Sequence, residues 1–264
     1  MALLFLVLLL FLLMALVGGE RGVNSFVVLI ANGVLCVLSV LLLSLGIHPI
    51  LILAVSSVLF VVFSLPFQNG LNQKTLASLL AVLLLMIPVS LAVGFICAHA
   101  HIAGLDEIQM YQIDNSYLSS GVRVNLTAVM LVSLVWGQLG AVIDTSITVA
   151  SSLNEVLLAH PELSGKPLVH EGLQIGKSII GTTINTLAFI AFGETILLCL
   201  LYVSDGYSLL LLLNSKSFFQ QFGGILFSCE SCLLVIPLTV VLFSKLTSSR
   251  RVTDFFARRA GKSS

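Results

Sequence analysis

Long runs of apolar residues, separated by short polar segments, dominate this chain. A helix needs about 20 apolar residues to cross the hydrocarbon core of a bilayer, within a range of about 17 to 25. The segments that meet this requirement are residues 1–17, 26–45, 50–67, 75–98, 122–144, 173–203 and 218–246. They are uniformly apolar, whereas the strands of a membrane β-barrel alternate. The pattern therefore predicts an all-α fold, a polytopic membrane helical bundle with about seven transmembrane helices.

The segments between these runs define the expected organisation. A polar loop covers residues 106–121, and residues 207–213 form an apolar stretch too short to span, which we expect to be interfacial or re-entrant. Pro88 and Pro237 are expected to kink their helices. The chain thus divides into a transmembrane bundle over residues 1–246 and a basic tail over residues 247–264.

Composition agrees with a membrane protein. Hydrophobic residues make up 58% of the chain and charged residues 9%, and the mean hydropathy is +1.13. Since a soluble domain carries roughly 25% charged residues, a water-soluble fold of this chain would lack a polar surface. The net charge of zero argues against nucleic acid as a partner. Five cysteines lie in or at the ends of apolar runs, which excludes the disulfide framework of a small secreted domain.

The distribution of Lys and Arg predicts the orientation, because loops rich in these residues stay in the cytoplasm. The tail and the end of the last predicted helix carry six of them, Lys245, Arg250, Arg251, Arg258, Arg259 and Lys262. We therefore expect a cytoplasmic C-terminus and, after seven spans, an N-terminus outside. Residues 1–17 lack the positive first region of a signal peptide, so we expect this helix to be retained; cleavage would leave six spans in the same orientation.

The fifth predicted helix carries polar side chains inside the membrane. Asp144, Thr148, Ser151 and Glu155 recur every three or four residues and so share one helical face. A charge at mid-bilayer costs about 3 kcal/mol on insertion scales, which makes these residues candidates for a transport path or vestibule. The alternative is a cytoplasmic extension of the helix whose polar face meets water.

The sixth predicted helix carries Lys177, Thr182, Asn185, Thr186 and Glu194. Thr182, Asn185 and Thr186 form one patch, whereas Glu194 points about 180° away from Asn185. The alternative for Asn185 is an interhelical hydrogen bond that fixes packing. Gly172 and Gly176 have the spacing of a close helix contact. The Gly-Lys-Ser sequence at 176–178 lacks the rest of a phosphate-binding loop, which excludes nucleotide binding there.

The seventh predicted helix places Glu230 close to mid-bilayer, where it must be protonated or paired. A protonated Glu230 would suit proton-coupled transport, and the alternative is an interhelical hydrogen bond. Lys177 is a partner only if the packing brings the two together. Cys229 and Cys232 share a face in mid-helix, where buried packing is a simpler role than redox or metal chemistry.

Cys97, His99 and His101 gather at the end of the fourth predicted helix and are weak candidates for a transition-metal site. Their alternation puts Cys97 and His101 on one face but not His99. Histidines that face water at the interface are the simpler interpretation. We expect no cofactor.

Two stretches resemble the bacterial YibE/F family of multi-pass membrane proteins: GAVIDTSITVASSLNE at 140–155 and IGKSIIGTTINTLAFIAFGE at 175–194. The residues that match the family pattern are Asp144, Asn154, Glu155, Gly181, Asn185, Thr186 and Glu194. The loop between the first two spans is short, as in the short, F-type member. The resemblance implies a bacterial plasma-membrane location and a second, longer YibE/F-type membrane subunit as partner.

Polar groups on several helices and short loops favour a transporter or permease subunit for a small solute or ion. The alternative is a non-transport membrane factor for assembly or signalling. An intramembrane enzyme would need paired Asp residues, a Ser/His pair or a zinc motif at membrane depth. The His residues of this sequence lie at predicted helix ends and in loops, so we expect no enzymatic activity.

Overall fold

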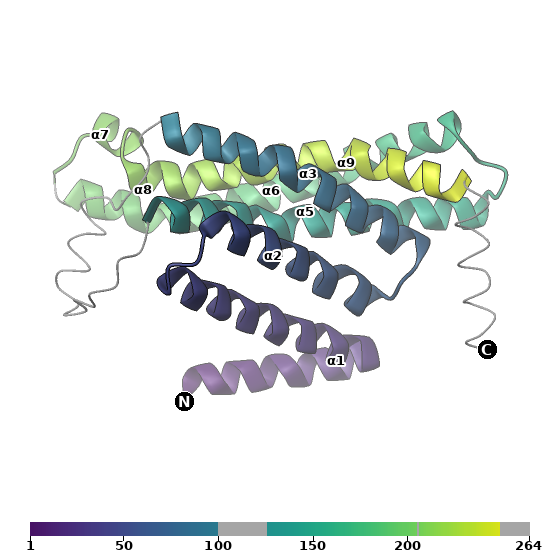
Figure 1. Cartoon of the computed structure of the whole chain (residues 1–264), viewed down its shortest axis with the longest axis horizontal. Coiled ribbons are helices and arrows are strands. Elements are labelled where there is room, and N and C mark those ends of the chain that lie inside the picture. Colours follow the sequence, from purple (N-terminus) through teal and green to yellow (C-terminus); the bar gives the residue numbers. More distant parts are fainter. Residues whose placement is uncertain (100–125, 205, 249–264) are drawn as a thin grey trace.

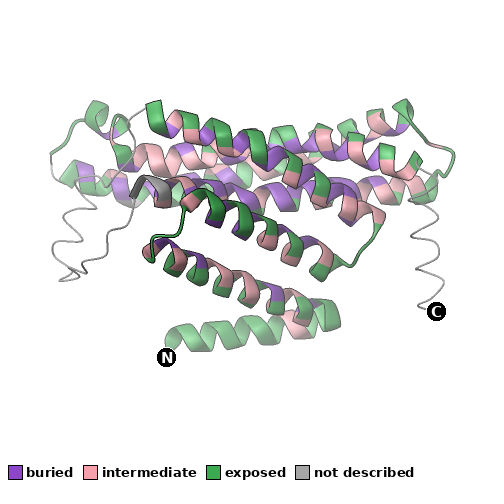
Figure 2. Cartoon of the chain, viewed as in Figure 1, coloured by how far each residue is buried: buried purple, intermediate pink, exposed green. Residues whose placement is uncertain are grey.

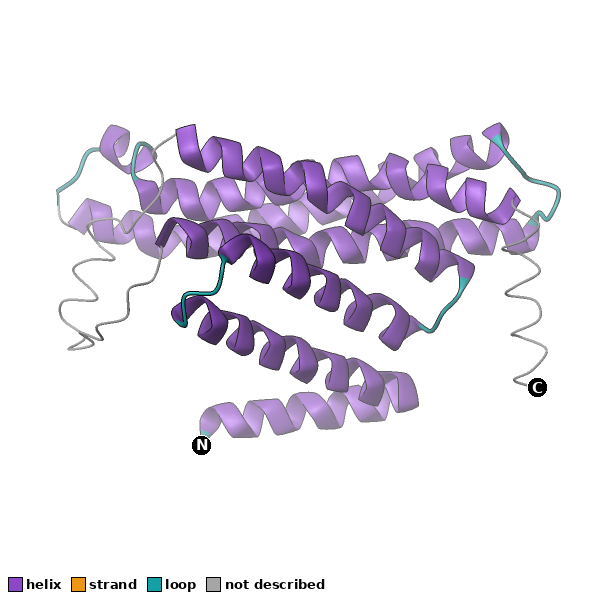
Figure 3. Ribbon diagram, viewed as in Figure 1, coloured by secondary structure: helices purple, strands orange, loops and turns teal. Residues whose placement is uncertain are grey.

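The chain folds into helices that run roughly along one common direction, as Figure 1 shows for a computed structural model of the protein. The structure describes residues 1–99, 126–204 and 206–248, and these contain helices and short loops but no strand (Figure 3). In chain order the elements are α1 (Ala2–Ser44), α2 (Pro49–Val62), η1 (Phe63–Phe67), α3 (Gln73–His99), α5 (Leu126–Ala159), α6 (Lys166–Ser204), α7 (Leu209–Leu213), α8 (Lys216–Phe218), η2 (Phe219–Gly223) and α9 (Gly224–Ser248). Both η elements are π-helical turns.

Six helices among the described residues are long and apolar enough to cross a membrane, which confirms the helical membrane bundle. They are Ala2–Ser44, Pro49–Phe67, Gln73–His99, Val129–Ala159, Lys166–Ser204 and Lys216–Ser248. The predicted count of about seven differs by one because α1 contains two of the predicted spans.

A reversal at Gly19 divides α1 into two arms, residues 2–18 and 20–44. Gly19 has φ 54° and ψ −136°, a conformation that glycine adopts without strain. The arms lie antiparallel in Figure 1, and the rings of Phe11 and Phe26 are 4.9 Å apart. A Cβ on Gly22 would clash with the backbone carbonyl of Met14, so the arms meet backbone to backbone. The loop predicted between residues 17 and 26 was therefore wrong: helix resumes directly after Gly19.

Two other predicted boundaries were wrong. Helix α6 begins at Lys166 rather than 173, since Pro167 suits the first helical turn and Gly165, at φ 61°, ends the preceding turn. Helix α5 continues past Asp144 to Ala159, so Glu155 belongs to the same straight element. The stretch 207–213 contains only the five-residue helix α7, which is too short to span, as predicted.

Helices α5 and α9 form the centre of the bundle and run parallel. Ser231 donates to Gln138 Oε1 at 2.8 Å, and the hydroxyls of Ser146 and Thr239 are 2.7 Å apart. Both pairs are separated by 93 positions along the chain, which fixes one register for the two helices. The core between α3, α5 and α9 contains fully buried apolar side chains such as Val93, Val135 and Val142.

Helix α6 runs antiparallel to α9 and packs tightly on it. A Cβ on Gly172 would lie 2.7 Å from Val240, and one on Gly176 would clash with Ile236. The close helix contact predicted from these two glycines is thus confirmed. At one depth in the bundle, residue numbers on α6 and α9 therefore sum to about 412 (172 + 240 and 176 + 236).

Burial decreases from the centre to α1, as Figure 2 shows. Residues 1–13 are exposed on every side, and α1 meets only α2 and η1 among its more extensive contacts. An apolar helix with this exposure is suited to lipid. We call the end of the bundle with residue 1 and the turn after α1 the N-terminal end, and the end with the α5–α6 turn and Ser248 the C-terminal end (Figure 1).

Candidate functional site

A stripe of polar and small residues runs along α5 on the face opposite its buried side. Its members recur at intervals of three or four: Ser133, Gly137, Gly140, Asp144, Thr148, Ser151 and Glu155. All are exposed except the half-buried Ser151. The prediction that Asp144, Thr148, Ser151 and Glu155 share a face is confirmed. We call these seven residues the α5 stripe.

Helix α6 presents a row of side chains to the same side of α5. The row follows every fourth residue: Ser178, Thr182, Thr186, Ile190 and Glu194. Ser178 lines a cavity with Glu155 of α5, while Ile190 and Glu194 line another with Gly137 of α5. Residues four apart stand above one another on a helix, so Thr182 and Thr186 connect these two points. We call these five residues the α6 inner row and the line between it and the α5 stripe the seam.

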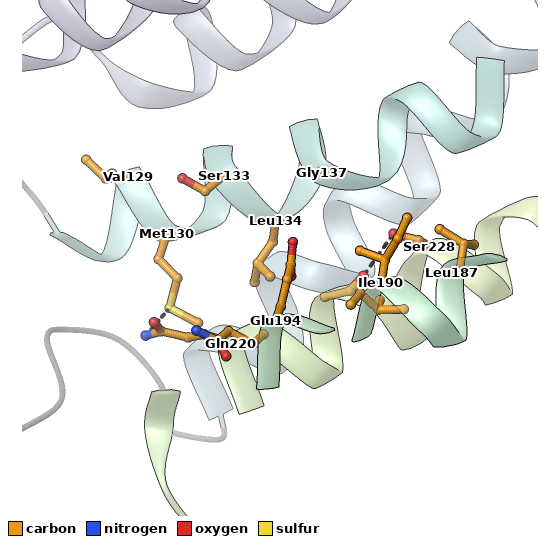
Figure 4. A pocket seen from close by; sticks show the side chains of 13 residues that line it. Val129, Met130, Ser133, Leu134, Gly137, Leu187, Ile190, Glu194, Gln220 and Ser228 are labelled. Carbon is orange, nitrogen blue, oxygen red and sulfur yellow. Dashed lines mark hydrogen bonds between the residues drawn. The ribbon is translucent and has the colours of Figure 1, made fainter. Parts of the chain in front are cut away.

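The cavity at the N-terminal end of the seam measures about 500 Å³ and lies between α5, α6 and α9 (Figure 4). Among its lining residues are Ser133, Gln220, Gln221 and Ser228, and Glu194 rises into it from α6. Glu194 makes no ion pair with another described residue. Gln220 Nε2 lies 3.4 Å from Met130 Sδ, and Gln221 Oε1 is buried without a hydrogen bond from the described chain. The cavity thus offers one carboxylate, two amides and hydroxyls to a ligand.

The π-helical turn η2 places the two glutamines at the wall of this cavity. A π-turn widens the helix by one residue and occurs often at functional sites. Here it spans Phe219–Gly223, directly before α9, and both Gln220 and Gln221 line the cavity as consecutive residues. The sequence prediction of one uninterrupted helix from 218 missed this turn, because no local sequence signal marks a π-turn.

The cavity at the C-terminal end of the seam measures about 580 Å³ and is wider open than the first. Its polar lining comprises Ser152, Glu155, His160 and Ser178. His160 Nδ1 lies 3.3 Å from a carboxylate oxygen of Glu162, a contact that is an ion pair when the imidazole is protonated. A carboxylate therefore marks each end of the seam, and Asp144 lies between them.

Three predicted residues lie on α6 beside the inner row, on the same exposed face of the helix. Lys177, Gly181 and Asn185 are exposed and four residues apart, so they form a second row, which we call the α6 outer row. Asn185 makes no hydrogen bond to any described side chain or backbone group, so the interhelical bond considered for it does not form within this chain. Thr182 and Thr186, by contrast, donate to carbonyls of their own helix, those of Ile179 and Thr182.

Glu230 also points outward. It is exposed on α9 among the exposed side chains of Leu226, Leu233 and Leu234. The ion pair considered between Glu230 and Lys177 does not form. In the α6–α9 register Lys177 is level with position 235 (412 − 177), about 8 Å along the axis from Glu230.

The remaining predicted candidates have ordinary surroundings. Asn154 is half-buried on α5, beside the stripe rather than in it. Cys97 is buried, whereas His99 is exposed, stacks on Phe95 and lies 2.9 Å from its carbonyl oxygen. The two do not converge on one point, and no metal-binding cluster occurs among the residues that the structure describes; His101 lies outside them. Cys229 is half-buried, Cys232 is buried, and both are thiols.

A protein-family model described as YibE/F-like protein matches residues 6–249. The chain belongs to the YibE/F-like family. Comparison with curated proteins and with solved structures gave no match. The family match extends from α1 to the end of α9, so it includes the whole bundle of this YibE/F-like chain. Of the residues in the resembling motif, Asp144, Glu155, Thr186 and Glu194 lie along the seam, and Gly181 and Asn185 lie in the outer row.

Proposed function

We propose that this YibE/F-like chain is a transport subunit that moves a small solute or ion along the seam between α5 and α6. The observation that carries the proposal is the seam itself, since hydroxyl and carboxyl groups from two helices connect cavities near opposite ends of the bundle. Ionisable groups at membrane depth are costly in lipid, and they commonly mark ion and solute pathways. Asp144 provides the central group, Glu194 and Glu155 the two ends.

Interrupted helices support the same function. Transporters build their sites where helices are broken, since a broken helix exposes polar groups that a regular one hides. Two of the spanning helices contain π-turns, η1 with Pro66 and η2 beside the cavity of Glu194. Pro88 and Pro237 lie inside α3 and α9, where each removes one backbone hydrogen bond of its helix.

We also propose a location and a partner for this chain. The C-terminal end of the bundle carries Arg21, Lys74, Lys166 and the start of the basic tail, so we place it in the cytoplasm of a bacterial cell, with residue 1 outside the plasma membrane. The family resemblance supports a longer YibE/F-type subunit as partner in the assembled permease. No catalytic step is part of the proposal.

The test is flux through the full chain in proteoliposomes, with the longer partner co-reconstituted. A panel of ions and amino acids is offered with and without an imposed proton gradient. Asp144→Asn and Glu194→Gln should reduce flux of the transported solute at least about tenfold, the effect of roughly 1.4 kcal/mol on the rate-limiting state. Glu20→Gln, a carboxylate at the α1 reversal far from the seam, is the matched control and should leave flux unchanged.

Flux that persists in both seam variants would show that the solute does not move along the seam. Absence of flux for every solute would reject transport and favour an assembly or signalling role. Alkylation of single-cysteine variants in whole cells tests the orientation: Ser133→Cys should react with a membrane-impermeant thiol reagent from outside intact cells, and Ser152→Cys only after permeabilisation. The reverse pattern would contradict the proposed orientation.

A further inference from the structure

The α6 outer row is a polar surface without a partner in this chain. Lys177, Gly181 and Asn185 face away from the bundle, and neither Lys177 nor Asn185 bonds to another described residue. In lipid an unpaired amide or ammonium group is costly, so protein contact is strongly favoured over hydrocarbon. Nothing lies within 4 Å of a Cβ built on Gly181, so a neighbouring helix can approach its backbone closely.

The charges on either side of α6 are complementary to each other. Ile175 and Ile179 face α5, where they line the C-terminal cavity, and Gly176 packs on α9. Successive helical residues turn by 100°, so Lys177 lies about 200° from Ile175, on the side of α6 away from α5. Asp144 lies on the α5 side. An acidic group and a basic group therefore flank α6 on opposite sides.

The two groups also lie at similar depths. A Cβ on Gly172 of α6 would lie 2.7 Å from Leu153 of α5, so residue numbers at one depth on these two antiparallel helices sum to about 325 (153 + 172), and Asp144 is level with position 181 (325 − 144). Lys177 is four residues from that level, about 6 Å along the axis, within reach of its long, flexible side chain. A two-fold rotation about the membrane normal keeps each residue at its own depth and places the α5 side of α6 in one chain against the opposite side of α6 in the other. It therefore brings Asp144 of each chain toward Lys177 of the other chain.

We propose that a second copy of this chain packs against the α6 outer row, with the two-fold axis along the membrane normal. The copies meet at Gly181, their Asn185 amides hydrogen-bond to each other near the axis, and Asp144 pairs with Lys177 across the interface. This contact is isologous, which means that both chains contribute the same surface, so the assembly closes at two chains. Each chain's Asp144, Lys177 and Asn185 then has a partner in the other chain. It does not rest on transport, and it is compatible with a longer family member bound elsewhere on the bundle.

Cysteine cross-linking of the full chain in membranes tests the contact. The five native cysteines are replaced by alanine, and Gly181→Cys is compared with Gly33→Cys, an equally open glycine on α1. Oxidation should convert the Gly181→Cys chain to a reductant-sensitive product of twice its mass and leave the Gly33→Cys chain monomeric. Equal cross-linking at both positions would overturn the proposal, as would a product of any other mass at Gly181→Cys.

A second measurement keeps the test valid should the cysteine-free chain fold poorly. Two differently tagged copies with native cysteines are co-expressed and co-purified in mild detergent. Asn185→Leu should weaken association roughly 3- to 30-fold, the range for one interhelical hydrogen bond in a membrane. Asp144→Lys and Lys177→Asp should each weaken it, and the double variant should restore it. Tagged copies that never co-purify, or a double variant weaker than both single ones, would contradict the two-fold pairing.

Discussion

The hydroxyl of Ser231 donates a 2.8 Å hydrogen bond to the side-chain carbonyl of Gln138, and both residues are buried. The amide nitrogen of the same Gln138 has no hydrogen-bond partner in the described chain, although the side chain is fully buried. This bond and the Ser146–Thr239 bond both link side chains of α5 to side chains of α9. Gln138 is therefore held by a single bond in an apolar core.

Removing that bond should destabilise the bundle. Ser231→Ala leaves both polar ends of Gln138 unsatisfied, and an unsatisfied buried group costs about 1–3 kcal/mol. We expect the free energy of unfolding, measured in mixed micelles with increasing denaturing detergent, to fall by this amount. Ser39→Ala is the matched control, because Ser39 is equally buried but bonds only within its own helix. A Ser231→Ala chain as stable as the control would show that Gln138 finds another partner.

Gly176→Ala should separate α6 from α9. The added methyl would clash with the branched Ile236 side chain, and overpacking of this kind costs about 1–3 kcal/mol. Thermal unfolding of purified protein measures the loss, and Ile236→Ala should rescue part of it in the double variant. Gly33→Ala, with nothing within 4 Å of its Cβ, should change stability little. Equal effects at the two glycines would contradict the close contact.

Glu230→Leu should stabilise the isolated chain. Glu230 stands among exposed leucines without a partner, and insertion scales assign a mid-membrane carboxylate a cost of about 3 kcal/mol. Since the group can protonate, we expect a gain of roughly 1–3 kcal/mol in the same unfolding assay. Glu162→Leu, in the α5–α6 turn, is the control and should show no such gain. A destabilised Glu230→Leu chain would indicate an interaction of Glu230 with another subunit.

The single tryptophan reports on the contact between α2 and α5. Trp136 Nε1 donates to Ser56 Oγ at 3.0 Å, and its ring lies 5.4 Å from that of Phe60. Ser56→Ala removes the bond, so the indole emission should shift to shorter wavelength and stability should fall by about 1 kcal/mol. Ser57→Ala, one residue along α2 and without a hydrogen bond, should leave the spectrum unchanged. Identical spectra in both variants would place Trp136 away from Ser56.

The sequence predicted what hydrophobic length and helical periodicity determine. The spanning segments, the shared face of Asp144 and Glu155 and the tight contact at Gly172 and Gly176 follow from spacing along a single helix. The α1 arms were predicted as spans, but their direct reversal was not, because it depends on the conformation of Gly19 and the absence of a side chain at Gly22.

Contacts between helices could not be predicted from the sequence. Gln138 and Ser231 are 93 positions apart, and their hydrogen bond depends on how α5 and α9 pack. For the same reason the outward direction of Asn185 and Glu230 could not be predicted: a helical pattern shows which residues share a face, but not which face meets a neighbour. Gln220 and Gln221 were overlooked because they lie at the helix start, where polar residues are common, and their cavity exists only between three helices.

The two hydrogen bonds between α5 and α9 have a mechanical consequence. A slide of one helix along the other must break both bonds at once, because they share one register, so the pair resists shear and moves as a single rod. Over residues 166–201, by contrast, the described side-chain hydrogen bonds of α6 run only to α6 itself. The contact of α6 with this rod is made instead by Gly172 and Gly176 against the apolar side chains of Val240 and Ile236. A displacement of α6 along the rod would therefore have to repack apolar side chains, but over this range it would break none of the described side-chain hydrogen bonds.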